Sequence, residues 1–408
     1  MIPILDDCLF EGSPVNASGN DSAGAWESGG ELNLLYWTYG VGIVVVAAPG
    51  LVGTLLTVAI MTRPEMRSCI NTYLAGLSVF DAVLLSMTLL LYAPLPYCRL
   101  WNSQFACLFS GHPVLLTYPL SLIAQTGSVW TCVVITLDRF VAVCYPLHAR
   151  AICTVTRARY VLLGVCVWAV LFNLPAFFEL MILNGRATPT TLRADATYKV
   201  VYKNYFYVTF MILIPVSIMI TVNGFVVRSI GRAYRQRQKL VSGREEKERK
   251  ITLMVVMIIV AFLLFNCLAF ISNFIEGFNP EWRRRHIHSF NVLVQFANLL
   301  VTFNSATNFL IYCAFGYRFR QMFLKLFCPC LYDPEREYRS LAVRFGSTRS
   351  TDPYGIVSMR SLPPTGPSPR PSTSGHHELT STNGFNFDFS ALSKTQRIQL
   401  LPPPSQFD

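Results

Sequence analysis

The sequence predicts an all-α membrane protein, a seven-transmembrane helix bundle with a short amphipathic eighth helix and a disordered C-terminal tail. Three observations predict this fold class. The 408 residues are 52% hydrophobic and only 14% charged, which is too apolar for an ordinary water-soluble protein. The chain contains seven apolar runs, each near the roughly 20 residues that a helix needs to cross a bilayer. Lysine and arginine cluster between particular runs and are absent before the first.

The leader, residues 1–33, is predicted to be extracellular and glycosylated. It carries no Lys or Arg, whereas residues 228–250 carry many, and positive loops stay on the cytoplasmic side. Asn16 and Asn20 each begin an Asn-X-Ser acceptor for glycosylation. Residues 1–10 lack the pattern of a cleavable signal peptide, so we expect the first helix to act as the signal. The expected location is the plasma membrane, with the N-terminus outside.

The bundle is predicted to occupy residues 34–316. The runs lack strict alternation, and a helix satisfies its own backbone polar groups in lipid, so we expect helices rather than barrel strands. Pro49, Pro175 and Pro215 are expected to kink them. The seven expected spans are 34–61, 72–94, 114–143, 160–180, 205–227, 251–274 and 290–314.

The segment that follows the bundle, residues 317–330, is predicted to be a helix lying on the membrane surface. Its aromatic and aliphatic residues share one face and its cations another. Cys328 and Cys330 at its end are either palmitoylation sites or unmodified thiols. Residues 331–408 are rich in Pro, Ser and Thr and cannot bury a core, so we expect a disordered cytoplasmic tail that protein kinases phosphorylate.

Composition also argues against other functions. The net charge of +11 lies where cytoplasmic loops should face anionic lipid, so we expect the lipid bilayer, and no nucleic acid, as the partner of these cations. The histidines lie outside the clear apolar runs and no catalytic constellation is evident, so no enzyme is expected. A transporter or channel is the main alternative, but the inverted repeats expected of it are not obvious.

Charged residues inside apolar runs are functional candidates, because they are costly in lipid. Asp81 lies midway along the second run, and near Ser and Asn oxygens it would suit sodium or a proton; the alternative is a neutral, hydrogen-bonded Asp. Asp138 and Arg139 end the third run. Arg139 could pair with Asp138 or with Glu248 before the sixth run, or simply reach to the membrane interface.

The segment Asp138–Leu147, DRFVAVCYPL, resembles the Asp-Arg-Tyr segment of rhodopsin-like G-protein-coupled receptors, with Phe140 replacing tyrosine. Four further motifs resemble the same family, in the family's order, and fall on the predicted helices: Leu77–Asp81, Trp168, Pro215 and Asn308–Tyr312. Within the family, residues 139–153 and 304–319 are most similar to invertebrate FMRFamide-type neuropeptide receptors.

The resemblance implies a sodium site made of Asp81, Ser128, Asn304 and Asn308, with no cofactor other than this ion. It also implies an activation lock at the cytoplasmic end, where Arg139 would contact a heterotrimeric G protein once the sixth helix swings outward. Receptor kinases and arrestin would act on the Ser/Thr-rich tail. The residues of this activation machinery would be Asp138, Arg139, Glu248, Asn308 and Tyr312.

The chain departs from the family pattern at several positions. Gly53-Thr54 replaces the usual Gly-Asn, Asn223 stands where tyrosine is frequent, and the sixth helix around Phe262–Leu268 lacks the usual Trp and Pro. Members also join the third helix to the second extracellular loop by a disulfide, but residues 179–204 contain no Cys. Cys98 with Cys107 is the preferred pair and Cys8 with Cys107 the alternative.

The ligand is predicted to be an extracellular peptide. Ser121 stands where amine receptors carry Asp, and the seventh run has no Lys for a retinal Schiff base. If the peptide ends in Arg-Phe-amide, Glu276 or Glu179 would bind its guanidinium, although either acid could instead be a solvated helix end. A lipid or another small molecule is the alternative ligand. The predicted pocket residues are Tyr118, Ser121, Gln125, Glu179, Asn273, Glu276 and Gln295.

Overall fold

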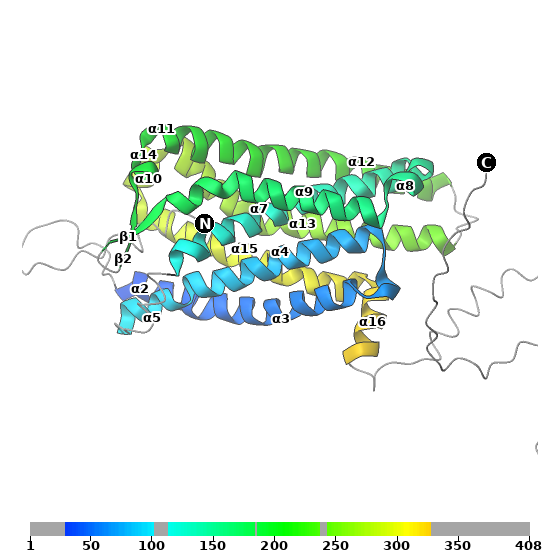
Figure 1. Ribbon diagram of the computed structural model, residues 1–408, viewed down its shortest axis with the longest axis horizontal. Helices are drawn as coiled ribbons and strands as arrows, with labels where there is room; N and C mark the ends of the chain where they lie inside the picture. The colour runs from blue at the N-terminus through cyan, green and yellow to red at the C-terminus, as the bar shows by residue number, and fades with distance from the viewer. Residues whose placement is uncertain (1–28, 102–112, 184–185, 237–242, 328–408) are drawn as a thin grey trace, which may run out of the picture. The chain divides into compact units, whose positions relative to one another are not determined.

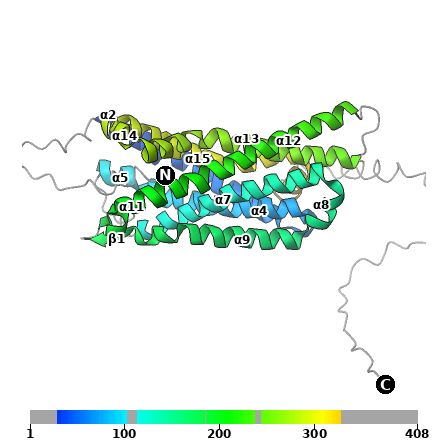
Figure 2. The ribbon, with the colours of Figure 1, turned by 90° about the horizontal axis from the view of Figure 1, so that it is seen from above.

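The computed structural model describes residues 29–101, 113–183, 186–236 and 243–327. The predicted sequons at Asn16 and Asn20, the predicted lipidation sites Cys328 and Cys330, and the predicted tail lie outside these residues. In the described part of the chain, long helices run side by side (Figures 1 and 2). The helices of the first half are α2 (Gly29–Leu35), the π-helical η1 (Tyr36–Ile43), α3 (Val44–Met61), the short 3-10 helix η2 (Pro64–Met66), α4 (Cys69–Tyr92), α5 (Pro94–Trp101) and α7 (Val114–Cys144).

The second half begins with the short helix α8 and the long helix α9, and a small antiparallel hairpin follows them. In the hairpin, Leu180 pairs with Pro189 and Leu183 with Arg186. The elements from α8 to the fifth span are α8 (Pro146–Ile152), α9 (Val155–Asn173), the 3-10 helix η3 (Leu174–Phe178), β1 (Leu180–Leu183), β2 (Arg186–Pro189), α10 (Thr191–Ala194), α11 (Ala196–Tyr198), the π-helical η4 (Lys199–Phe206) and η5 (Val208–Leu213), and α12 (Ile214–Gln236). The remaining helices are α13 (Gly243–Phe278), α14 (Pro280–Arg285), α15 (Ile287–Phe315) and α16 (Tyr317–Phe327).

Seven spans are confirmed in place. Six segments of the described residues are long and apolar enough to cross a membrane, and the bent pair α15 and α16 supplies the seventh. The bend between these two helices is 97° and falls at Gly316. The spans begin and end within a few residues of the expected ones, except that the fifth starts earlier, at Ala196. Exposed leucines such as Leu163, Leu264 and Leu310 cover the outer surface, as expected where lipid rather than water is the solvent.

Local sequence explains where several helices start and bend. Ser68 and Thr154 are the N-caps of α4 and α9, where each accepts the backbone N–H three residues on. Pro49 lies inside α3, as expected. Pro175 does not kink a helix: it follows the last turn of α9 and lies in the 3-10 helix η3, because proline cannot donate the hydrogen bond that would continue the α-helix. Pro215 follows the π-helical η5, and α13 and α15 contain no proline.

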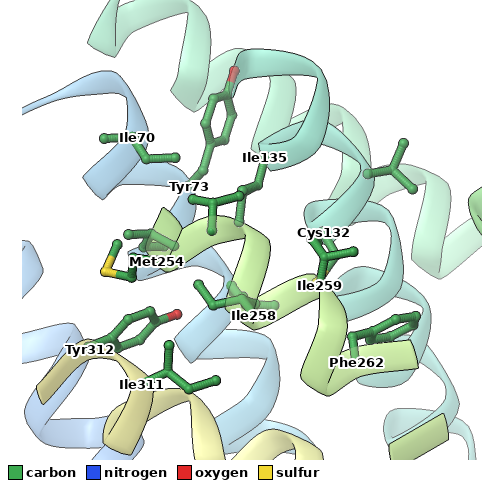
Figure 3. Close-up of a cluster of buried hydrophobic side chains, with 14 of the residues drawn as sticks. Ile70, Tyr73, Cys132, Ile135, Met254, Ile258, Ile259, Phe262, Ile311 and Tyr312 are labelled. Atoms are coloured by element: carbon green, nitrogen blue, oxygen red, sulfur yellow. The ribbon is translucent and has the colours of Figure 1, made fainter. Parts of the chain in front are cut away.

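Two buried apolar clusters form the core. The first lies toward the end of the bundle that carries the hairpin and includes the rings of Tyr39 and Tyr92, which contact each other at a tilt of 48°. The second lies toward the end that carries Arg139 and joins α4, α7, α13 and α15. Figure 3 shows Ile258 of α13 lying close to Tyr312 and Ile311 of α15 in this second cluster. The polar groups that carry chemistry are interleaved with these clusters, and their positions are therefore fixed by packing.

Candidate functional site

A buried carboxylate links three helices in the middle of the bundle. Asp81 of α4 has no exposed surface. Its Oδ1 accepts hydrogen bonds from the hydroxyls of Ser128 on α7 and Ser305 on α15, each at 3.0 Å. Its Oδ2 accepts a hydrogen bond from the amide of Asn308, also on α15, at 2.7 Å. The carboxylate is thus fully enclosed by polar donors, as burial of such a group requires.

The sequence identified two of these three donors. Ser128 and Asn308 were expected beside Asp81, whereas the third donor among the described residues is Ser305 rather than Asn304. Asn304 is buried on the same helix. Residues 304 and 305 are four and three positions before Asn308, so either can share its helix face, and only the rotation of α15 decides between them.

The residues around Asp81 fit a small hard cation. A carboxylate, two hydroxyls and an amide supply only hard donor atoms, and oxygen ligands are what sodium and similar ions prefer. The hydroxyls of Ser128 and Ser305 are both donors and acceptors. Each could rotate its hydrogen away from a bound ion and offer an oxygen lone pair as a ligand. The same contacts also stabilise the carboxylate without an ion.

At one end of the bundle, an arginine is held by its neighbour. Nη2 and Nε of Arg139 donate to Oδ2 of Asp138 at 2.6 and 3.1 Å. Both residues are buried, with exposed fractions of 5% and 8%. Arg139 is therefore paired inside the protein and does not extend to the membrane interface. Glu248 lies in α13, but its side chain is outside the described part of the structure, so the predicted lock between helices stays a prediction.

Tyr312, the last member of the predicted activation machinery, is fully buried near that end. Its ring packs on Phe319 of α16, with 5.7 Å between ring centroids. Phe309, which replaces the proline of the family motif, packs on the same ring with an edge-to-face geometry. The bend after α15 is thus filled by aromatic side chains from both helices.

At the opposite end, Glu179 is the centre of a buried polar cluster. Its Oε2 is 3.0 Å from Nη1 of Arg193, 2.7 Å from Nζ of Lys203 and 3.0 Å from the hydroxyl of Tyr118, while Oε1 accepts from the hydroxyl of Tyr198 at 2.7 Å. Glu179 is only 1% exposed. It lies just outside the fourth span, between η3 and β1, and the segment from α10 to η4 turns back to supply its partners.

The charge of Glu179 is set by these contacts. Burial alone would raise the pKa of this carboxyl, but Lys203, the hydroxyl of Tyr198 and Arg193 outweigh burial and hold the pKa below its usual range. A ligand guanidinium could reach Glu179 only by displacing a cation of the chain itself. The expectation that Glu179 serves as a ligand contact is therefore weakened, and its structural role is the one that the geometry supports.

Glu276 is the more accessible of the two candidate acids. Its side chain is 25% exposed, and its Oε1 forms an ion pair with Nη1 of Arg283 at 3.7 Å. Asn273, one turn earlier on α13, is partly buried and donates to the backbone oxygen of Ala269. Glu276 thus places a partly exposed carboxylate near the hairpin end of the bundle.

The remaining predicted pocket residues are placed on α7 and α15. The hydroxyl of Ser121 donates to the backbone oxygen of Tyr118 at 2.7 Å. Gln295 accepts a hydrogen bond from Thr38 at 2.9 Å. The Oε1 atom of Gln125 is buried and accepts no hydrogen bond from the described residues. Within the predicted set, Tyr118 is hydrogen-bonded to Glu179 through its hydroxyl and to Ser121 through its backbone oxygen.

The structure bears on the choice of disulfide. Cys98 is disulfide-bonded, as the preferred pairing requires and the alternative does not. Cys107 and Cys8 themselves lie outside the described residues.

The sequence reasoning missed three partners of Glu179, which are Arg193, Tyr198 and Lys203. Several loop residues could have served equally well, and nothing in the sequence shows which of them turn back toward the bundle.

Comparison with known proteins gives a family match over most of the bundle. The profile of the seven-transmembrane receptors of the rhodopsin family matches residues 53–312. The chain is 33% identical over 306 residues to an FMRFamide receptor of Drosophila melanogaster, covering 72% of this chain and 54% of that protein. It is 32% identical over 292 residues to an FMRFamide peptide receptor of Caenorhabditis elegans, covering 68% and 66%. A sex peptide receptor of Drosophila melanogaster is 25% identical over 309 residues, covering 67% and 68%. The chain thus aligns with less than two thirds of the length of the first two relatives.

Proposed function

The chain belongs to the rhodopsin family of seven-transmembrane receptors, and from that premise we propose that it is a plasma-membrane receptor for an amidated neuropeptide. The observation that carries this proposal is its similarity to two FMRFamide receptors, which covers 72% and 68% of this chain. Ser121 supports it from the ligand side, because an amine receptor would be expected to place an acid there. The absence of Lys and Arg from the leader supports an extracellular N-terminus.

Glu276 is the proposed contact for a basic peptide side chain. Its side chain is 25% exposed, so a ligand guanidinium could reach its carboxylate and form a charge-assisted contact. Glu179 would act indirectly, by holding the segment from α10 to η4 in place beside the ligand. The unbonded Oε1 of Gln125 could accept a hydrogen bond from a peptide amide.

The proposed signal leaves through the end of the bundle that carries Arg139. Outward movement of α13 would separate Ile258 from Ile311 and Tyr312 and would open a space beside Arg139. Arg139 would then exchange Asp138 for a heterotrimeric G protein. Receptor kinases and arrestin, acting on the Ser/Thr-rich tail, complete the proposal. Asp81, Ser128, Ser305 and Asn308 would hold a sodium ion, which when bound supplies positive charge to the buried carboxylate.

The test is a second-messenger assay in cells that express the full chain, challenged with amidated peptides, amines and lipids. We expect sub-micromolar activation by a peptide ending in Arg-Phe-amide. Glu276→Gln should lower the potency of that peptide about 10- to 100-fold, because a charge-assisted contact contributes about 1.5–3 kcal/mol. Glu281→Gln, which removes an exposed acid from the neighbouring α14, is the matched control and should change nothing. A response to lipids with none to peptides would contradict the proposal.

A further inference from the structure

Two cysteines and an aspartate from distant parts of the chain meet beside Arg139. Cys69 is the first residue of α4, Asp138 lies near the end of α7, and Cys153 directly follows α8. One ligand atom from each, the two Sγ atoms and a carboxylate oxygen, lie within 4.8 Å of one another. The Sγ of Cys69 is 3.2 Å from Oδ1 of Asp138, and both cysteines are free thiols.

We propose that Cys69, Cys153 and Asp138 bind a zinc ion. Zinc is held by thiolate sulfur and carboxylate oxygen in tetrahedral geometry, and sites with three protein ligands keep a fourth position for water. Tetrahedral bonds of about 2.0–2.3 Å place neighbouring ligand atoms about 3.4–3.8 Å apart. The sulfur of Cys69 lies 3.2 Å from Oδ1 of Asp138, and all three atoms lie within 4.8 Å of one another, so small rotations of the side chains would complete the site.

The surroundings of the carboxylate suit a metal ligand. Oδ1 of Asp138 faces Cys69, while Oδ2 is held by Nη2 and Nε of Arg139. A metal on Oδ1 therefore leaves the second oxygen to Arg139, and metal-ligating carboxylates are commonly fixed by such an outer partner. The ion pair that orients Asp138 is thus already in place.

The net charge of the buried cluster, counted together with Arg139, stays at zero when zinc binds. Before binding, the charges of Asp138 and Arg139 cancel. On binding, the thiols of Cys69 and Cys153 each release a proton to solvent, so the Zn²⁺ ion with two thiolates and one carboxylate carries a single negative charge. Arg139 offsets that charge. No unpaired charge is created in a region where one would be costly.

The site is also reachable. Cys69 and Asp138 are buried, but Cys153 is partly exposed and its neighbours Ile152 and Thr154 are exposed. An ion can therefore enter from the side of Cys153, and a water molecule can occupy the fourth position there. The chemistry of the three ligands and their access point to a soft divalent cation rather than to calcium or magnesium, which prefer all-oxygen sites.

The experiment is a cobalt titration of the purified full-length chain in detergent under reducing conditions. Cobalt takes the place of zinc and gives a thiolate-to-metal absorption band that reports sulfur ligation. We expect about one bound ion per chain, displaced by zinc. Cys69→Ser and Cys153→Ser should each weaken binding more than about tenfold, since even changes to outer partners cost about 10- to 100-fold. Cys144→Ser, which alters a partly buried cysteine at the end of α7, should bind like the wild type.

Three results would overturn the proposal. One is a wild-type chain that gives no cobalt–thiolate band. Another is a band that survives both Cys153→Ser, a substitution at a partly exposed site that should preserve folding, and Cys69→Ser. The third is peptide mapping that finds Cys69 and Cys153 joined as a disulfide even under reductant, with no metal bound. Because the readout is metal binding, the test does not depend on the peptide or on G-protein coupling.

Discussion

Lys203 and Glu179 form an ion pair with 2.7 Å between Nζ and Oε2, and the glutamate is almost wholly enclosed. The pair connects η4 to the start of the hairpin, while Tyr118 connects the same carboxylate to α7. Residues 179–204 contain no Cys that could attach them by a disulfide, and this polar network joins the loop to the third helix of the bundle. The loop is thus held by electrostatics.

Removing the charge of Glu179 should destabilise the protein. Glu179→Gln leaves Arg193 and Lys203 without their shared carboxylate, and breaking a buried pair of this kind costs about 3–5 kcal/mol. The unfolding temperature of the detergent-purified protein measures this effect. Glu281→Gln, at an exposed ion pair on α14, should have no measurable effect. Equal unfolding temperatures for the two variants would show that the network around Glu179 does not contribute to stability.

The same carboxylate predicts a dependence of stability on pH. The folded-state pKa of Glu179 is lowered, so its contribution is present above the unfolded-state pKa of about 4.3 and is lost as pH falls through the folded value. We expect the unfolding temperature to fall below about pH 4. In Glu179→Gln the unfolding temperature should depend less on pH in this range, as measured by thermal unfolding at a series of pH values. The same pH dependence in the variant as in the wild type would contradict the assignment.

The Asp81 centre predicts a response to sodium. Replacing choline with sodium should raise the unfolding temperature of the wild type, because an ion that binds only the folded state stabilises it. Asp81→Asn should abolish the rise and Ser305→Ala should reduce it. Ser86→Ala is the control, since that hydroxyl donates to the backbone oxygen of Ala82 and not to Asp81. A sodium effect that persists in Asp81→Asn would favour a neutral aspartic acid.

Arg139 should be required for coupling. Arg139→Ala is expected to abolish the G-protein response to agonist, expressed per receptor at the cell surface as measured by antibody labelling, in addition to the destabilisation caused by loss of its buried pair with Asp138. Arg139 is the single arginine of α7, so no other side chain of this helix can supply a guanidinium in its place. Arg63→Ala, an exposed arginine after α3, is the comparison and should keep the response. Normal signalling by Arg139→Ala would remove it from the proposed mechanism.

Packing between α13 and α15 should restrain activation. Ile258 is 1% exposed in the cluster that contains Ile311 and Tyr312, so Ile258→Ala removes buried methyl groups at a cost of about 2–5 kcal/mol. If outward movement of α13 activates the receptor, basal second-messenger levels should rise in this variant. Leu264→Ala, on the lipid-facing side of the same helix, should leave them unchanged. Equal basal levels would indicate that this contact is kept on activation.

The spans could be predicted because the length of an apolar run is a local property of the sequence. Asp81 and Arg139 could be singled out for the same reason, since a charge in an apolar run is visible without a structure. Ser305 was missed because its place depends on how α15 rotates about its own axis. The partners of Glu179 were missed because they depend on the path of a loop. The meeting of Cys69 with Cys153 depends on the packing of three separate elements.

The lack of proline in α13 and α15 determines what kind of motion is open to these helices. A proline interrupts backbone hydrogen bonds and provides a hinge, so a helix without one resists bending. With 36 residues, α13 is about 54 Å long, and tilting it by about 10° around its midpoint would carry each end about 5 Å. Such a helix would tilt as a rigid body about its midpoint. An inward displacement near Glu276 would then produce an equal outward displacement at the other end.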